Sequence, residues 1–241
     1  MVDQVTTIAI LLAAGRGKRM NSNTAKQYLL LRDKPVLYYS LKAFQESRID
    51  HIILVTGAGE CDYVRREIVE QYGFTKVSCI VEGGKERYHS VYNGLLAAAE
   101  YAEKETYAFI HDGARPFITD DIIEKAYACV TKEHACVVGM PVKDTVKIAD
   151  EEGYAANTPK RSLVWMMQTP QVFELSLITA AYSELIKREE ELANEGVQVT
   201  DDACVVELFS DHRVKLVEGS YENIKITTPE DLVVAERFLE K

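Results

Sequence analysis

The chain has few of the residues that build disulfide scaffolds, zinc sites or membrane spans. Its 241 residues include five cysteines, none of which lies in a Cys-x-x-Cys pair. This odd, scattered set excludes a disulfide framework and a zinc site built on paired cysteines. No apolar run approaches the ~20 residues that span a bilayer, and no charged lead-in followed by an apolar stretch marks a secretion signal. We therefore expect a soluble, cytoplasmic protein with reduced thiols and no membrane partner.

Positive charge is also scarce, since the formal net charge is −10. A nucleic acid polymer is a poor partner for such a chain, because nonspecific binding of that kind needs broad positive surface. One stretch departs from this balance: residues 4–32 contain no Asp or Glu but hold five cations, Arg16, Lys18, Arg19, Lys26 and Arg32. This local reversal predicts a small anionic ligand.

The first apolar run leads directly into this basic stretch. Residues 8–12 are typical of a strand buried on both faces, and the small residues after it, Ala13, Ala14, Gly15 and Gly17, let backbone N–H groups approach a phosphate. The glycine frame ends on Met20, which excludes a dinucleotide fingerprint, and Arg19 follows Gly17-Lys18 where a nucleoside-triphosphatase loop needs Ser or Thr. An ordinary strand-to-loop turn with solvated bases remains the alternative.

Apolar strand-like runs alternate with helix-like segments through the first half of the chain. The expected strands are 8–12, 51–55, 77–81, 107–111 and 135–140, and the expected helices are 35–45, 63–70, 87–102 and one after Thr119. This alternation predicts an α/β fold with a single doubly wound, mostly parallel sheet, and we prefer one domain over residues 1–241 to two small ones. Ligands then belong at the carboxyl ends of the strands.

The rhythm breaks at about 141–173, which includes Pro159, Pro170 and the only tryptophan, Trp165. We interpret this region as an inserted β-arm that either covers the sheet or reaches a second subunit. Further on we expect a long charged helix over 174–194, a helix opening at Thr200, and a last helix that Thr228 caps with Pro229 at its first position.

Two glycine-containing segments follow expected strands. Gly84 leads into a helix from which Arg87 and Ser90 would point toward the first loop, although a plain turn and cap is an equally good interpretation. Asp112 follows the next strand and is placed to hold a divalent cation, and Arg115 to grip a phosphate. Their alternatives are an Asx turn and a salt bridge between these two side chains.

Other polar residues carry weaker signals. Ser90 lacks the Gly-x-Ser-x-Gly turn of a hydrolase, and the histidines show no zinc-ligand spacing, so both classes are excluded. Thr145, Arg161 and Lys225 are each more typical of a solvated face. Lys225 also lies in a β-like segment, where a lysine protects an edge strand.

Eight motifs, taken in order, carry a resemblance over nearly the whole chain. They are LLAAGRGKRM, AKQY, GGKERYHSV, HDGARPFI, PVKDTVK, QTPQVF, TDDA and NIKITTPEDL. Together they resemble the 2-C-methyl-D-erythritol 4-phosphate cytidylyltransferase family, which has a Rossmann-like nucleotidyltransferase fold and transfers CMP from CTP to that sugar-alcohol phosphate, releasing pyrophosphate. The related ribitol 5-phosphate enzymes typically carry Ser-Val-Arg-Pro where this chain has Gly113-Ala114-Arg-Pro, so the first family is favoured.

The resemblance implies roles for matching residues. Nucleotide binding falls to Ala13, Ala14, Gly15, Gly17, Arg19, Lys26, Gly84, Arg87, Ser90, Asp112 and Gly113. Sugar-phosphate binding falls to Asp112, Arg115, Thr145, Arg161 and Lys225. The catalytic residues implied are Arg19, Lys26, Arg161 and Lys225. Asp112 would also ligate Mg²⁺, and the arm of one subunit in a homodimer would complete its partner's site.

Two departures from the family pattern concern the site, Ala25 in place of a frequent proline and Lys85 in place of a common aspartate. Neither removes a charge-bearing catalytic group. Two other functions remain open: a ribitol 5-phosphate cytidylyltransferase of cell-wall polymer synthesis, and a nonenzymatic nucleotide-binding regulator on the same fold.

Overall fold

The computed structural model describes residues 5–15, 20 and 24–240 of the chain. Within this part, seven strands form the main sheet in the order β11-β7-β10-β6-β1-β4-β5. Their bounds are β1 Val5–Ala13, β4 His51–Thr56, β5 Val77–Glu82, β6 Glu105–Asp112, β7 Ala135–Pro141, β10 Trp165–Glu174 and β11 Lys215–Glu218. Only β10 runs antiparallel to its neighbours, so the expected mostly parallel sheet is confirmed.

Strand β1 lies between β4 and β6 and is buried on both faces. Ile10 pairs with Ile53 on one side and Ile110 on the other, and all three are fully buried. A run of aliphatic residues without polar alternation suits this position, because helices cover both faces of a parallel sheet.

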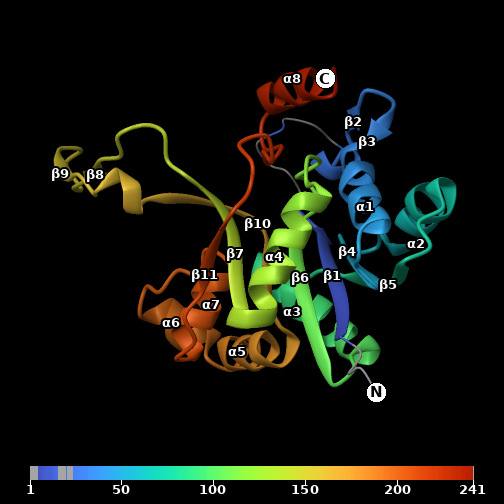
Figure 1. Ribbon diagram of the computed structural model, residues 1–241, viewed down its shortest axis with the longest axis horizontal. Coiled ribbons are helices and arrows are strands. Elements are labelled where there is room, and N and C mark those ends of the chain that lie inside the picture. The colour runs from blue at the N-terminus through green and yellow to red at the C-terminus, as the bar shows by residue number, and fades with distance from the viewer. Residues whose placement is uncertain (1–4, 16–19, 21–23, 241) are drawn as a thin grey trace.

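The helices cover the two faces of the sheet in separate layers, as Figure 1 shows. Apolar side chains of α1, α2, η3 and α4 pack on one face, and those of α3, α5 and α7 pack on the other. The bounds on the first face are α1 Val36–Glu46, α2 Cys61–Val64, the π-helical η3 Arg65–Glu70 and α4 Asp120–Glu133. Those on the second are α3 Arg87–Ala98, α5 Leu175–Lys187 and α7 Asp202–Phe209. The sheet is therefore doubly wound.

Shorter elements connect this framework. They are η2 Lys26–Tyr28, β2 Leu30–Leu31, β3 Lys34–Pro35, η4 Ala99–Tyr101, α6 Glu189–Asn194 and the last helix, α8 Pro229–Phe238. The expected cap of α8 is confirmed, because Asp231 Oδ2 accepts hydrogen bonds from the backbone N–H groups of Thr227 and Thr228. In the part of the chain that the structure describes, no helix is long and apolar enough to cross a membrane.

The segment that departs from the sheet is shorter than the expected arm. Residues 165–174, at the end of the expected 141–173, form β10, which is inserted between β6 and β7. Residues 142–164 make the excursion, with β8 Ile148–Ala149, β9 Ala155–Asn157 and η5 Arg161–Leu163. Figure 1 shows β8 and β9 at the far end of this excursion, well away from the sheet. Trp, Met, Gln and Pro in β10 lack the β-branched run that marked the other strands.

The structure differs from the sequence interpretation at three further points. The charged helix over 174–194 is two helices, α5 and α6, with a break at Arg188. Strand β11 was not expected, because it is only four residues long and mostly exposed. Lys225 does not protect an edge strand, since residues 219–228 form no strand at all.

Candidate nucleotide site

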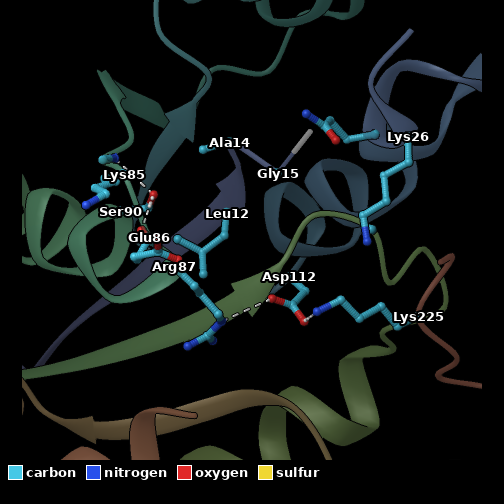
Figure 2. Close-up of a pocket in the computed structure, with 13 residues that line it drawn as sticks. Leu12, Ala14, Gly15, Lys26, Lys85, Glu86, Arg87, Ser90, Asp112 and Lys225 are labelled. Carbon is cyan, nitrogen blue, oxygen red and sulfur yellow. Dashed lines mark hydrogen bonds and ion pairs between the residues drawn. The ribbon is translucent and has the colours of Figure 1, made fainter. Parts of the chain in front are cut away.

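A cavity of about 660 Å³ opens at the carboxyl ends of β1, β5 and β6. Figure 2 shows charged side chains entering it from several segments. Its wall consists of Leu12, Ala14, Gly15, Lys26, Gln27, Gly84, Lys85, Glu86, Arg87, Ser90, Asp112, Ala114 and Lys225. A second hollow of about 450 Å³ shares Ala14, Gly15 and Gly84 with it and extends past Gly83 to Glu60.

The end of β1 is tied to the segment that carries Lys26. Gln27 donates a side-chain hydrogen bond to the buried carbonyl oxygen of Ala13, and the Tyr28 hydroxyl donates to Glu60 Oε2 at 2.8 Å. Burial and the neighbouring Glu60 carboxylate raise the pKa of Tyr28 far above its usual value, so this hydroxyl keeps its proton. These two bonds bring Lys26 to the cavity wall.

The turn between β5 and α3 packs directly against the first loop. A Cβ on Gly83 would lie 2.5 Å from Ala14 Cβ, so only glycine fits there without a shift. Ser90 Oγ accepts from the Gly84 N–H at 3.1 Å and donates to the Glu86 carbonyl at 3.2 Å. Ser90 thus lies on the cavity wall and also holds the turn. Its place on the wall agrees with a side chain that points toward the first loop, and its two hydrogen bonds agree with a plain turn and cap.

Asp112 is surrounded by cations. Its Oδ2 lies 2.7 Å from Lys225 Nζ and 3.8 Å from Arg115 Nε, and its Oδ1 lies 3.8 Å from Arg87 Nε. Figure 2 shows Arg87 and Lys225 reaching this carboxylate from opposite sides. Burial by itself raises the pKa of Asp112, but Lys225, followed by Arg87 and Arg115, outweighs that effect and holds the pKa well below its ordinary range. The carboxylate is therefore ionised at neutral pH.

Arg115 acts behind the cavity rather than on its wall. Its Nη1 donates to the carbonyl oxygen of Asn223 at 2.7 Å, two residues before Lys225. The backbone N–H of Ile226 donates to Ala114 at 2.8 Å. The loop after β6 therefore holds the segment that presents Lys225. The Asp112–Arg115 ion pair, which was the alternative interpretation of this segment, is part of the same arrangement.

Not every residue expected at the site lies on this wall. Ala13 and Gly113 are buried behind it, and Gly113 packs closely on Leu37. Thr145 and Arg161 are exposed in the excursion, where Arg161 Nη1 donates to the Lys143 carbonyl at 3.2 Å. Gly17 and Arg19 lie outside the described residues.

Several residues that the structure brings to the site carry no role predicted from the sequence. Gln27, Lys85 and Glu86 line the cavity from segments whose neighbours were singled out. Arg87 makes a two-point ion pair with Asp202, at 2.7 and 2.8 Å. Asp202 belongs to the TDDA motif. The two adjacent carboxylates of that motif are the one feature of the sequence that could have pointed to this ion pair.

A magnesium ion can be accommodated at the wall only with help from a ligand. No group of three or more His, Cys, Asp or Glu side chains comes together in the part of the chain that the structure describes. Asp112 is nevertheless an ionised oxygen donor facing a cavity, and Mg²⁺ in nucleotide enzymes is commonly held by one or two carboxylates plus phosphate oxygens. The residues present fit that arrangement.

These features define a class: an α/β protein with a doubly wound, mostly parallel sheet and a charged cavity for a phosphorylated ligand at the carboxyl ends of its strands. Residues 7–241 match the model of the IspD family, 2-C-methyl-D-erythritol 4-phosphate cytidylyltransferase. The chain therefore belongs to the 2-C-methyl-D-erythritol 4-phosphate cytidylyltransferase family.

Individual relatives agree with this membership. The enzyme of that name from Lachnospira eligens is 51% identical over 96% of this chain and 98% of its own length. The one from Lachnoclostridium phytofermentans is 49% identical over 96% and 95%. Among solved structures, the 4-diphosphocytidyl-2C-methyl-D-erythritol synthase of Anaerococcus prevotii has a TM-score of 0.80 and 35% identity, covering 98% of this chain and 96% of its own.

Proposed function

We propose that this protein transfers CMP from CTP to 2-C-methyl-D-erythritol 4-phosphate and releases pyrophosphate, in the non-mevalonate route to isoprenoids. The observation that carries the proposal is the meeting of four charged motif residues, Lys26, Arg87, Asp112 and Lys225, from distant segments on one cavity wall. Family membership over residues 7–241 supplies the reaction.

The reaction needs charge compensation rather than proton removal. A phosphate oxygen of the acceptor attacks the α-phosphorus of CTP, and the bond from that phosphorus to the bridging oxygen of the β-phosphate breaks. Its electron pair leaves with pyrophosphate. Because the nucleophile is already an anion, no general base is required. The main barrier to overcome is repulsion between two polyanions.

The cations of the wall suit this task. Lys26 and Lys225 enter the cavity from different segments, and in our proposal they lie beside the phosphates that meet there. Arg19, outside the described residues, would add a third charge. Fixed cations of this kind stabilise developing charge and align an incoming oxygen with its leaving group.

Asp112 is our proposed ligand for Mg²⁺. The ion would supply further neutralisation of the triphosphate. The residues of this chain do the rest: Asp112 stays ionised because Lys225, Arg87 and Arg115 surround it, and Lys225 lies close enough to exchange this carboxylate for a substrate phosphate.

The nucleoside would lie along the glycine turns. We propose that Ala14 and Gly15 bind CTP through their backbone, with Ala13 supporting them from behind the wall, and that Gly84, Arg87 and Ser90 help to hold cytosine and ribose. Cytosine differs from uracil by its N4 donor, so fixed acceptors in such a pocket reject the wrong base by leaving a buried group unpaired. Lys85 adds a cation at this end of the cavity.

The excursion would serve a second subunit. Thr145 and Arg161 are exposed and absent from the wall of their own cavity, and apolar side chains near them, Tyr154 and Leu163, are 70% and 75% exposed. We propose a homodimer in which this segment covers the partner's cavity and Arg161 binds the sugar phosphate. Residues 1–241 would then form one nucleotidyltransferase domain.

A pyrophosphate-release assay tests the proposed function. Purified protein is incubated with CTP and Mg²⁺, with 2-C-methyl-D-erythritol 4-phosphate, with ribitol 5-phosphate, or with no acceptor. We expect release with the first acceptor only. Preference for ribitol 5-phosphate would identify the cell-wall enzyme instead, and CTP binding without release under any condition would indicate a nonenzymatic regulator.

A further inference from the structure

Asp202, the first residue of α7, is a fully buried carboxylate that grips a residue of the cavity wall. Its two oxygens accept from Nη1 and Nη2 of Arg87 at 2.7 and 2.8 Å, and its side chain has no exposed surface. A two-point contact of this kind fixes the plane of a guanidinium as well as its position.

Two elements away from the cavity hold Asp202 in place. The buried Tyr182 of α5 donates its hydroxyl hydrogen to Asp202 Oδ1 at 2.5 Å. Gln171 of β10 uses Oε1 to accept from the backbone N–H groups of Asp202 and Ala203, both at 2.9 Å. A buried ion pair with satisfied partners is a rigid anchor, whereas breaking it leaves a charge without compensation.

This anchor determines which edge of Arg87 faces the cavity. With both terminal nitrogens bound to Asp202, Nε lies 3.8 Å from Asp112 Oδ1, and a dashed line marks this contact in Figure 2. Burial alone lowers the pKa of Arg87, but Asp202 outweighs it and keeps that pKa well above its usual value. A guanidinium released from Asp202 would have Asp112 within reach for a two-point pair of its own.

We propose that Asp202 is a positioning residue of the nucleotide site. It fixes the Arg87 guanidinium on the cavity wall and keeps it from closing on Asp112, so that Asp112 remains open to a divalent cation and phosphate oxygens. Asp202 touches no ligand itself. This inference rests on the proposed function, because it assigns CTP to the cavity.

The test compares Asp202→Asn with a matched neighbour, Asp201→Asn. Asp201 caps the same helix by accepting from the Cys204 N–H at 2.9 Å, and its Oδ2 accepts from Gln171 Nε2 at 3.0 Å. Asp201→Asn therefore removes a charge from the same hydrogen-bonded cluster without touching Arg87, which separates loss of the Arg87 contact from loss of a charge. CTP affinity is measured by calorimetry without acceptor, over a series of Mg²⁺ concentrations. We expect Asp202→Asn to weaken CTP binding by about tenfold or more and to raise the Mg²⁺ concentration needed for it. Asp201→Asn should stay within about twofold of the wild type.

A double variant separates positioning from general damage. If Asp202 acts by holding Arg87, then Arg87→Met/Asp202→Asn binds CTP no more weakly than Arg87→Met alone, and it needs less Mg²⁺ than Asp202→Asn, because the competing guanidinium is gone. A merely structural role predicts additive losses in both measurements, which would overturn the proposal.

Tyr182→Phe provides a milder variant should Asp202→Asn fail to fold. It removes one donor to Asp202 without changing charge, and we expect about fivefold weaker CTP binding. If whichever of Asp202→Asn and Tyr182→Phe folds binds CTP as tightly as the wild type, the inference is contradicted. Failure of the wild type to bind CTP would instead contradict the proposed function, so the two failures are distinguishable.

Discussion

At the residue scale, the site is organised by the compensation of charge. Asp112 contacts three cations, and Arg87 lies between two carboxylates, one in the cavity and one buried behind it. Neighbouring His111 is fully buried with both ring nitrogens bonded, so it is not available as a base. This arrangement suits a reaction limited by repulsion between anions.

Lys26→Ala tests that reasoning at its simplest. Removing one preorganised charge should lower kcat about 10²- to 10³-fold with CTP and acceptor saturating, and Arg19→Ala should behave alike. Lys42→Ala is the matched control, since Lys42 pairs with exposed Glu46 on the surface of α1, away from the cavity wall. Steady-state kinetics give the comparison, and near-wild-type turnover in Lys26→Ala would remove it from the proposed mechanism.

His111 should make the stability of the fold depend on pH. Burial lowers its pKa to about 4, and its neutral ring donates from Nε2 to the Arg115 carbonyl while Nδ1 accepts from the Thr169 hydroxyl. The unfolded chain takes up this proton near pH 6.5, so the stabilisation is fully present above that pH and is lost as the pH falls toward 4.

Urea unfolding in metal-free buffer measures this effect. We expect the free energy of unfolding to fall by roughly 3 kcal/mol more in the wild type than in His111→Asn between pH 7 and pH 4. Parallel profiles for the two proteins would show that His111 is not responsible.

At the element scale, the turns after β1 and β5 shape the cavity by how closely they approach. A Cβ on Gly83 would lie 2.5 Å from Ala14 Cβ and 3.2 Å from the Thr56 carbonyl oxygen. No atom of the described residues lies within 4 Å of a Cβ on Gly15. Packing therefore requires a glycine at position 83, whereas Gly15 borders open space.

Substitution of these two glycines should therefore have different effects. Gly83→Ala must push the turns apart, and we expect a stability loss of about 1–3 kcal/mol together with weaker CTP binding. Gly15→Ala should leave stability within about 0.5 kcal/mol but still weaken CTP binding, because the methyl group enters the ligand's space. Thermal unfolding and calorimetry follow the two properties separately. A larger loss of stability in Gly15→Ala than in Gly83→Ala would contradict this account.

The predictability of these elements from sequence depended on their burial. Strands such as β1 and β4 are buried on both faces and therefore carry uninterrupted aliphatic runs, which placed them within a few residues. Strand β10 is equally central but is built from Trp, Met, Gln and Pro, and its neighbours in the sheet are distant in sequence. Strand β11 is too short and exposed to leave a hydrophobic pattern.

The residues of the site were also predicted only in part, because local motifs mark individual side chains but not the contacts between distant segments. Lys26, Asp112 and Lys225 follow recognisable motifs, so their approach to one cavity was expected. The contact of Arg87 with Asp202 spans 115 positions, and no local spacing reveals it. Arg115 was expected on a phosphate, but its backbone contact with Asn223 depends on how two loops meet.

At the scale of the whole molecule, residues 142–164 extend away from the sheet (Figure 1) and expose apolar side chains. Contact with a second subunit would explain both features. We expect Arg161→Ala to raise the KM for the sugar phosphate far more than that for CTP, because only the acceptor would lose a phosphate contact. Lys160→Ala removes the same charge from the neighbouring position and should change neither KM appreciably. Equal increases in both constants for Arg161→Ala would indicate a purely structural arm.

Mixing two impaired variants, at an acceptor concentration far below the KM expected for Arg161→Ala, tests the exchange of arms directly. In dimers formed from Lys26→Ala and Arg161→Ala subunits, one of the two sites combines an intact cavity with an intact arm. Random exchange should therefore restore about a quarter of wild-type activity. The two variants are unfolded and refolded together, and a mixture that stays impaired after subunit exchange has been verified would contradict arm sharing.

The central claim is that this cavity joins CMP to methylerythritol phosphate. Phosphorus-31 NMR of the protein with CTP, Mg²⁺ and 2-C-methyl-D-erythritol 4-phosphate follows every phosphate in the reaction at once. We predict that both substrates disappear together and that pyrophosphate and one unsymmetrical diphosphate ester appear in equal amounts. A spectrum in which the acceptor phosphate is unchanged, or in which CTP is hydrolysed without forming the ester, would contradict the claim.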